Sequence, residues 1–176
     1  RLDSPNASAT GNIAAAEVAM GKAFLLRGKT REAEACFQRA VRTSPVRAET
    51  YNDMGAAWIA LAQLKTGAQR RIAKTEYNRG MECLLKAVKL RPGYAMALRN
   101  IVETCNDLGA RYGQAGNMKE AIRAFTIAIE MDEAINKHAS VRSWLAKSFY
   151  NRAVAYVHVQ EYARAVRDCT RAVEIN

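Results

Sequence analysis

Two short stretches of this 176-residue chain nearly repeat each other and bring carboxylate and amide side chains together. They read ETYNDMG from Glu49 to Gly55 and ETCNDLG from Glu103 to Gly109, with five of seven letters the same. Within each stretch, the residues at steps of three and four share one face of an α-helix. Such a face would bind lysine, arginine or amide groups through charge-assisted hydrogen bonds, worth about 1.5–3 kcal/mol each when partly desolvated. The polar residues are Glu49, Asn52, Asp53, Glu103, Asn106 and Asp107. The alternative is an ordinary solvated face whose asparagine and aspartate make local hydrogen bonds.

The sequence contains no recognisable catalytic or metal-binding motif. Its two histidines, His138 and His158, lie in no motif with cysteine, serine and carboxylate partners. Walker, G-x-G-x-x-G and HExxH patterns are missing, and the four cysteines include no C-x-x-C pair. The sequence therefore predicts a protein that is not an enzyme and that uses no cofactor and no metal.

The composition predicts a soluble, helical protein. Apolar residues make up 49% and charged residues 25% of the chain, and apolar positions recur every three or four residues. No apolar run approaches the ~20 residues of a membrane-spanning helix. The four cysteines fall on apolar faces, so we expect them to be buried and reduced, which favours a cytoplasmic location. Because the chain begins at Arg1 without methionine, we expect it to be a piece of a longer protein, whose signal, anchor or catalytic domain would not be visible here.

A repeat organises the chain. Gly21 and Gly55 lie 34 residues apart, and the letters around them agree, AMGKAF against DMGAAW. The first unit then alternates large and small residues in the order Met20, Gly21, Phe24, Gly28, Ala33, Phe37, Ala40 and Pro45. This pattern resembles the tetratricopeptide-repeat (TPR) family, whose period is about 34 residues. The resemblance implies an all-α fold: a right-handed superhelical array of antiparallel helix pairs, with small residues where helix A and helix B of a pair approach closely.

Four repeats can be aligned after an N-terminal extension of residues 1–12, and we expect residues 13–176 to form a single array. The repeats cover residues 14–47, 48–94, 102–135 and 146–176. The second carries about thirteen extra residues, which we place as nearly two additional turns on each helix, so the second hairpin should be elongated. The segment AMALRNI should extend the third repeat's first helix backward, and residues 136–145, with His138 and Trp144, should form a linker.

The resemblance also implies a function. TPR arrays as a class bind other proteins in a concave groove lined by their A helices. The expected ligand is a peptide or partner protein, with a preference for basic or amide-rich segments. Threading the carboxylate clamp of chaperone-binding members onto repeats one to three places Asp53, Glu103 and Asp107 at clamp positions, where their charge is wrong for a carboxylate. The predicted partner-binding residues are Lys22, Glu49, Asn52, Asp53, Glu103, Asn106, Asp107, Lys147, Tyr150 and Asn151.

The net charge of +10 suggests a second possibility. Residues 65–91 contain eight basic and two acidic side chains. This basic hairpin could bind nucleic acid or an anionic membrane surface, or be a solvated face. Nucleic acid is the less favoured partner because no aromatic stacking platform accompanies the charge. A third alternative is self-association into a homo-oligomer through the apolar end faces of the array. The predicted basic patch comprises Lys65, Arg70, Arg71, Lys74 and Arg79.

Overall fold

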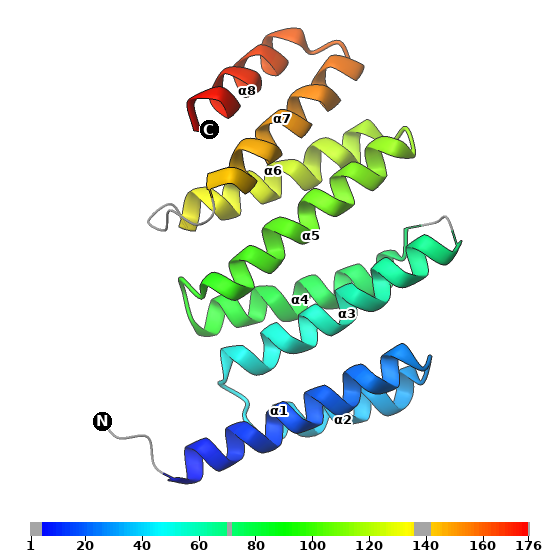
Figure 1. Cartoon of the computed structure of the whole chain (residues 1–176), viewed down its shortest axis with the longest axis vertical. Coiled ribbons are helices and arrows are strands. Elements are labelled where there is room, and N and C mark those ends of the chain that lie inside the picture. The colour runs from blue at the N-terminus through cyan, green and yellow to red at the C-terminus, as the bar shows by residue number, and fades with distance from the viewer. Residues whose placement is uncertain (1–4, 70–71, 136–141, 176) are drawn as a thin grey trace. The chain divides into compact units, whose positions relative to one another are not determined.

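The computed structural model describes residues 5–69, 72–135 and 142–175, with side chains for residues 8–67, 72–131 and 144–175. In these segments all regular structure is α-helical (Figure 1). The all-α prediction is therefore confirmed. The helices are α1 (Pro5–Leu26), α2 (Thr30–Thr43), α3 (Ala48–Gln69), α4 (Lys74–Leu90), α5 (Ala95–Gln114), α6 (Met118–Ile135), α7 (Arg142–His158) and α8 (Tyr162–Ile175).

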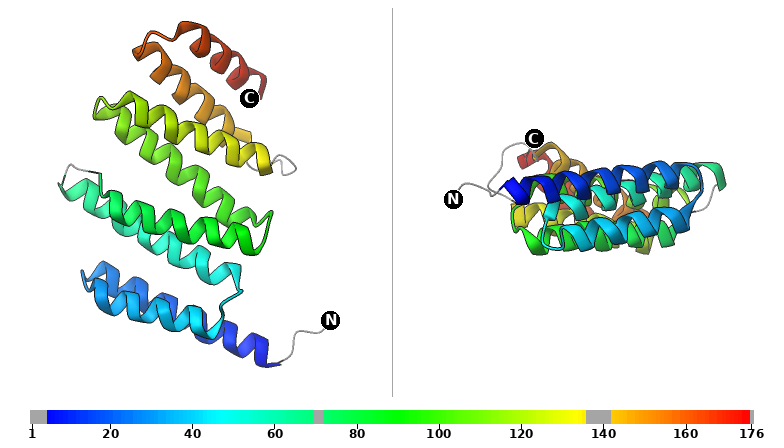
Figure 2. Two further views of the ribbon diagram at one scale, coloured as in Figure 1. Left: turned by 180° about the vertical axis from the view of Figure 1, so that it is seen from behind. Right: turned by 90° about the horizontal axis from the view of Figure 1, so that it is seen from below.

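The chain divides into two compact units, Arg1–Ala97 and Leu98–Asn176. Unit 1 contains the antiparallel pairs α1 with α2 and α3 with α4, and α1 also packs on α3 (Figures 1 and 2). Unit 2 contains most of α5, with α6 packed on α7 and α7 on α8. Each unit is thus built from helical hairpins, as the repeat pattern predicts.

The turns after α1, α5 and α7 are of one kind. Gly28 follows α1 with φ of 74°, and Gly116 follows α5 with φ of 76°. Both angles lie in the left-handed region that glycine adopts without steric cost. The N–H of Lys29 then donates to the carbonyl of Phe24 at 2.9 Å and closes the end of α1. After α7 the same position is filled by Gln160 with φ of 61°, so the turn persists where the glycine is lost.

Within a hairpin the two helices touch where one of them carries a glycine. A Cβ atom built on Gly21 would lie 2.4 Å from the ring of Phe37, and one on Gly109 would lie 2.5 Å from the ring of Phe125. At Gly55 the nearest atoms would belong to Leu84, at 2.7 Å, and to the backbone oxygen of Gly80, at 2.9 Å. Any larger side chain would force these helices apart.

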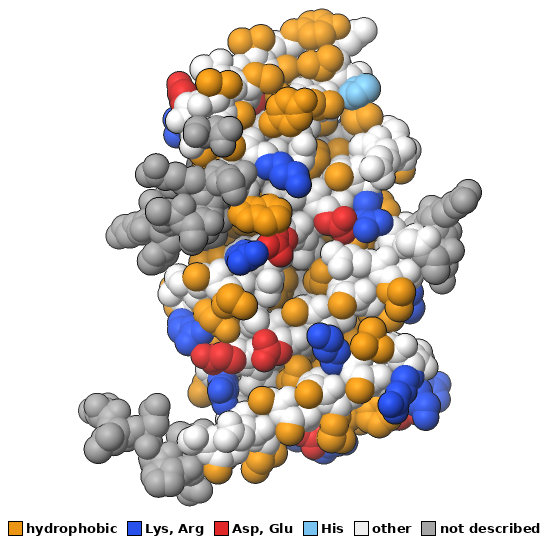
Figure 3. All heavy atoms as spheres, in the orientation of Figure 1, with side chains coloured by type: hydrophobic (Ala, Val, Ile, Leu, Met, Phe, Trp, Pro, Cys, Tyr) orange, Lys and Arg blue, Asp and Glu red, His pale blue; other side chains and the backbone are white. Residues whose placement is uncertain are grey.

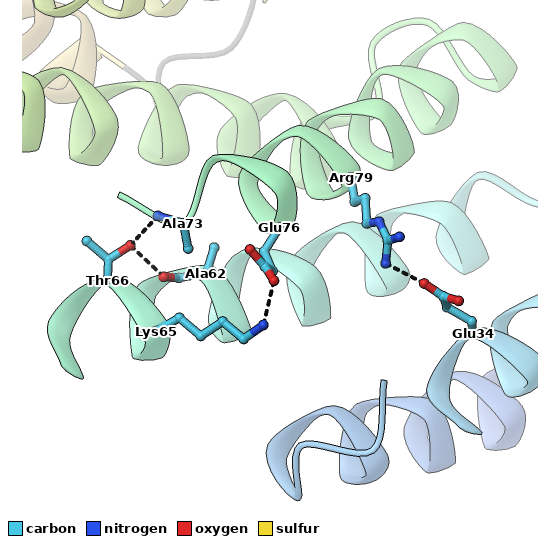
Figure 4. Close-up of polar contacts among 7 residues, drawn as sticks. All are labelled: Glu34, Ala62, Lys65, Thr66, Ala73, Glu76 and Arg79. Carbon is cyan, nitrogen blue, oxygen red and sulfur yellow. Dashed lines mark hydrogen bonds and ion pairs between the residues drawn. The ribbon is translucent and has the colours of Figure 1, made fainter. Parts of the chain in front are cut away.

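The second hairpin is elongated, chiefly on α3. This helix continues fourteen residues from Gly55 to its end at Gln69, whereas α1 continues five residues from the equivalent Gly21 to Leu26. The nine additional residues make about two and a half turns. A hydroxyl group helps to fix the tip: Thr66 Oγ1 donates to the carbonyl of Ala62 at 2.7 Å and accepts the N–H of Ala73 at 3.1 Å (Figure 4).

Helix α4 is lengthened much less than the nearly two turns that we expected, so this prediction is wrong in extent. This helix begins at Lys74, six residues before Gly80, whereas α2 begins at Thr30, three residues before the equivalent Ala33. The gain of three residues is less than one turn. Ala73, the residue before α4, has non-helical backbone angles (φ −77°, ψ 69°), and its N–H donates to Thr66.

Two other helix boundaries bear on the predictions. Helix α5 begins at Ala95, so the expected backward extension of the third repeat is confirmed. Trp144 was expected in a linker but lies in α7, which begins at Arg142. His138 lies outside the described residues.

The cysteines do not all lie in the core. Cys36 and Cys105 are buried and Cys83 is partly buried, but Cys169 is exposed on α8, against the expectation. Burial raises the pKa of the Cys105 thiol to about 12. Burial, followed by the charge of Glu82, raises the pKa of Cys83 to about 11. Both thiols are therefore neutral packing groups near pH 7.

We predict opposite effects for alanine at two glycines of the same helix, α5. Gly109→Ala should lower the free energy of unfolding by about 1–3 kcal/mol, because the new methyl group collides with Phe125. Gly113→Ala should raise it by about 0.5–1 kcal/mol, because a Cβ there meets nothing within 4 Å and alanine favours the helix. Urea unfolding of both variants measures the difference, and equal effects would contradict the packing described above.

Candidate functional site

The predicted partner-binding residues of unit 1 differ in exposure. Lys22 on α1 and Asp53 on α3 are exposed, and Glu49 is partly exposed. Asn52 is buried, with 3% of its surface exposed, and its Nδ2 donates to Asp53 Oδ1 at 3.0 Å. Among the described residues no lysine or arginine forms an ion pair with Asp53. On the described surface of α3, a partner could thus reach Asp53 but not Asn52.

Glu49 is already matched by cations of its own unit. Its carboxylate pairs with Arg91 at 2.7 Å and with Arg47 at 3.6 Å. Burial would raise the pKa of Glu49, but a hydrogen bond to its own backbone and the two guanidinium groups outweigh burial and lower the pKa below its ordinary value. The Arg91 guanidinium also stacks 3.7 Å from the centre of the Tyr94 ring. The site is therefore a balanced cluster rather than an excess of negative charge.

The carboxylates predicted in unit 2 are paired in the same way. Glu103 accepts a hydrogen bond from Arg99 at 2.8 Å, and Asp107 pairs with Arg111 at 2.9 Å, each four residues away on α5. Figure 3 shows the red carboxylates beside blue lysine and arginine side chains over α3 and over α5. Since exposed pairs of this kind are worth about 0–1 kcal/mol, an incoming cation could exchange with them.

Asn106 does not line an open surface, and this corrects its predicted position. Only 5% of its surface is exposed, and its Nδ2 donates to Ser148 Oγ on α7 at 2.8 Å. Ser148 is fully buried and also lies 2.9 Å from the carbonyl oxygen of Trp144. The amide therefore ties α5 to α7 inside unit 2, where it satisfies a buried hydroxyl group.

The remaining predicted residues lie on α7 and two of them meet at a pocket. Lys147 is exposed, with its Nζ 5.6 Å from the centre of the Trp144 ring. Tyr150 is 58% exposed and Asn151 is partly exposed. Tyr150 and Asn151 form one side of a pocket with a volume of about 440 Å³ between α5, α6 and α7. It is the strongest candidate site in unit 2.

The pocket has an apolar floor with a polar rim. Its α5 side consists of Gly109, Ala110, Gly113 and Gln114, and its α6 side of Met118, Ala121 and Phe125. Its α7 side consists of Tyr150, Asn151, Val154, Ala155 and His158. At Gly113 the wall has no side chain at all, and a Cβ added there would meet nothing within 4 Å. This room could receive an apolar side chain of a partner.

Several lining residues were not among those predicted for binding. Gln114, Met118 and His158 are the polar and flexible members of this group. The spacing of four residues from Tyr150 to Val154 and from Val154 to His158 places the three on one face of α7, and this spacing was the available signal.

The predicted basic patch is largely paired as well. Lys65 bonds to Glu76 at 2.5 Å, and Arg79 of α4 pairs with Glu34 of α2 (Figure 4). Lys74 is exposed and has a partner of its own, while Arg70 and Arg71 lie outside the described residues.

Glu76 shows the effect of this pairing on a carboxylate. Burial raises its pKa, but the hydrogen bond and charge of Lys65 contribute to an overall lowering. The described part of the hairpin thus presents less unmatched positive charge than its composition indicates.

Two classes of site find no support among the described residues. None of the helices in residues 5–69, 72–135 and 142–175 is long and apolar enough to cross a membrane. Across the same segments, histidine, cysteine, aspartate and glutamate nowhere gather in a group of three that could hold a metal ion.

The packing contacts agree with the repeat pattern of the sequence. Gly21, Gly55 and Gly109 each lie against a large side chain of the following helix, and turns with a left-handed residue follow α1, α5 and α7. These are the positions that define the repeat. The chain is similar to tetratricopeptide-repeat proteins in its helix pairs and in the glycines between them. No protein-family model matches its sequence.

Curated relatives match part of the chain. It is 31% identical over 74 residues to the mitochondrial import receptor subunit TOM70 of Rattus norvegicus, which covers 42% of this chain and 11% of the relative. The Homo sapiens protein of the same name is 30% identical over 88 residues, or 48% of this chain and 14% of the relative. The match therefore spans a small part of these longer proteins.

Solved structures of MamA also resemble the chain. One covers 92% of this chain and 77% of its own at a TM-score of 0.47 and 18% identity. Another covers 96% of this chain and 75% of its own at a TM-score of 0.49 and 19% identity.

We predict that Ser148→Ala lowers the free energy of unfolding by about 1–3 kcal/mol, because it leaves the buried Asn106 amide without its partner. Thr170→Ala is the matched control, since that hydroxyl is exposed and bonds only within α8, and it should change the free energy by about 0.5 kcal/mol or less. Urea unfolding measures both. A harmless Ser148→Ala would show that Asn106 is able to turn toward solvent.

Proposed function

We propose that this chain is a non-enzymatic protein-interaction module, and that the pocket between α5, α6 and α7 receives an apolar side chain of a partner segment. The observation that carries the proposal is the open wall at Gly113, where a cavity of about 440 Å³ has a glycine in place of a side chain. Apolar cavities with a few polar groups at the rim are the usual form of a binding site.

The rim of the pocket suits a peptide rather than a small metabolite. Tyr150 stands 58% exposed at the edge, and tyrosine is enriched where proteins meet because it offers a large apolar ring with a polar end. Asn151 and Gln114 add amide groups, which can both donate to and accept from a peptide backbone. An extended segment could bond to these amides while one of its side chains enters the pocket.

The finer preference that we propose is for basic or amide-rich segments. Its support is the set of carboxylates on α3 and α5, especially the exposed Asp53, which has no ion-pair partner among the described residues. The pairs at Glu103 and Asp107 are only partly buried and join residues of one helix, so a partner's lysine or arginine could replace the internal cation. A receptor role, in keeping with the name of the curated relatives, is consistent with such a module.

The test is to select binding peptides from a displayed library and to compare two leucine variants. Gly113→Leu adds an apolar side chain to the pocket wall, at a position where a Cβ meets nothing within 4 Å, and should weaken binding of the selected peptides at least about tenfold. Gly67→Leu is the matched control, because Gly67 on α3 is equally open and lies in unit 1. It should leave the affinity unchanged.

Circular dichroism and urea unfolding should show both variants folded, since leucine is a better helix former than glycine. Peptides that bind Gly113→Leu as well as they bind the natural chain would contradict the pocket assignment. Selected peptides with no apolar residue in common would contradict the proposed mode of binding.

A further inference from the structure

A second pocket of unit 2 gathers arginine side chains and shares no residue with the pocket at Gly113. It has a volume of about 430 Å³ and lies between α7 and α8. Four arginines and one aspartate line it together with two aromatic rings. The lining residues are Phe149, Arg152, Tyr156, Arg164, Arg167, Asp168 and Arg171.

The base of this pocket is a matched ion pair. Arg152 donates to both carboxylate oxygens of Asp168, at 2.7 and 2.9 Å, and its third bond goes to Thr126 Oγ1 of α6 at 3.0 Å. The side chains of the pair are only 14% and 9% exposed. Arg152 and Asp168 therefore neutralise each other, and the positive charge of the pocket comes from the three arginines of α8.

Those three arginines are available to a ligand. Among the described residues, Arg164 and Arg171 pair only with carboxylates three residues away, on or beside their own helix, and their side chains are 57% and 56% exposed. Such exposed pairs are weak and exchange easily. Arg167 is exposed and forms no ion pair with any described residue. Their spacing along α8 brings the three guanidinium groups to one pocket, where each can bind an oxyanion through two parallel N–H groups.

Unit 1 contains the same arrangement with a carboxylate already in place. Arg79 directly precedes Gly80 and its guanidinium lies 4.7 Å from the centre of the Trp58 ring. Arg164 directly precedes Ala165, the equivalent small residue, and lies 5.7 Å from the centre of the Tyr156 ring. In unit 1 the carboxylate of Glu34, from α2, pairs with Arg79 (Figure 4).

The equivalent carboxylate is missing in unit 2. Glu34 directly follows Ala33, and the residue that directly follows the equivalent Ala121 of α6 is Ile122. Ile122 packs against the cluster of Ala153, Tyr156 and Ala165, so it lies beside the arginine pocket. Unit 1 thus shows that this arginine and aromatic pair accepts a carboxylate from the preceding hairpin. In unit 2 the same pair has an isoleucine at that position, and its arginine pairs only weakly with the exposed Glu161.

We propose that the α7 and α8 pocket binds the carboxylates of an acidic peptide segment of a partner protein. Nucleic acid fits less well, because it would need an open aromatic face for base stacking. The Tyr156 ring is faced by Arg152 and Arg164, at 5.8 and 5.7 Å, and the Phe149 ring by Arg152 at 5.5 Å. This site is independent of the pocket at Gly113 and has the opposite charge preference.

The first experiment measures binding of a fluorescein-labelled peptide of aspartate, glutamate and serine by fluorescence anisotropy. The variant Arg164→Gln/Arg167→Gln/Arg171→Gln should bind it at least about tenfold more weakly than the natural chain. The control Arg27→Gln/Arg31→Gln/Arg123→Gln removes the same charge from exposed positions outside the pocket and should retain nearly full affinity. Equal losses in the two variants would overturn the proposal, as would the absence of binding to the natural chain.

The second experiment tests the comparison between the units. Ile122→Glu places a carboxylate where Glu34 stands in unit 1 and should weaken the acidic peptide several-fold relative to Ile122→Gln, which has the same size without the charge. Equal affinities of these two variants would overturn the proposed role of the arginine pocket. A labelled single-stranded oligonucleotide is run beside the peptide, and tighter, pocket-dependent binding of the oligonucleotide would also overturn it.

Discussion

The close approach of paired helices at glycine is the constraint on which the rest of the structure depends. At Gly21 and Gly109 the A helix rests on an aromatic ring of the following helix, with no room for even one more methyl group. This contact fixes the rotation of each A helix about its own axis, and so decides which of its side chains lie inside. In unit 2 it buries Asn106 against Ser148 and turns Ala110 and Gly113 toward an open pocket. Helix α5 thus packs inside the unit with one face and lines the pocket with another.

The charge that a partner meets depends on which charged side chains pair within the chain, and not only on how many there are. The sequence predicts an acidic surface on α3, yet Glu49 of this helix forms an ion pair with Arg91. In the basic hairpin, Arg79 and Lys65 form ion pairs with Glu34 and Glu76. Helix α8 brings three arginines to one pocket, and one of them, Arg167, forms no ion pair with any described residue. A partner therefore meets the charged groups that these internal pairs leave exposed, and not the full set of charged residues.

Much of the fold could be predicted because its signals are local. The repeat can be recognised from the interval between Gly21 and Gly55 and from the glycines at the hairpin turns. The misses arise from contacts between residues far apart in the sequence. The residues near Asn106 do not indicate that it is buried against Ser148, 42 residues later. The residues near Glu49 likewise do not indicate its pairing with Arg91, also 42 residues away. The sequence around Thr66 does not indicate that the insertion lengthens α3 far more than α4. The pocket at Gly113 is a product of three helices, and only Tyr150 and Asn151 among its lining residues were predicted for binding.

The central claim is that the A helices of unit 2 leave an open apolar pocket that takes a partner's side chain. The most direct test is to assign the backbone amide resonances of the chain and to titrate it with a peptide selected for binding. The account predicts that the largest chemical-shift changes fall on Ala110, Gly113, Tyr150 and Val154, which line the pocket. The changes at Gly21 and Gly55, inside the hairpins, should be small. Changes concentrated on other helices, with the resonance of Gly113 unmoved at saturation, would contradict it.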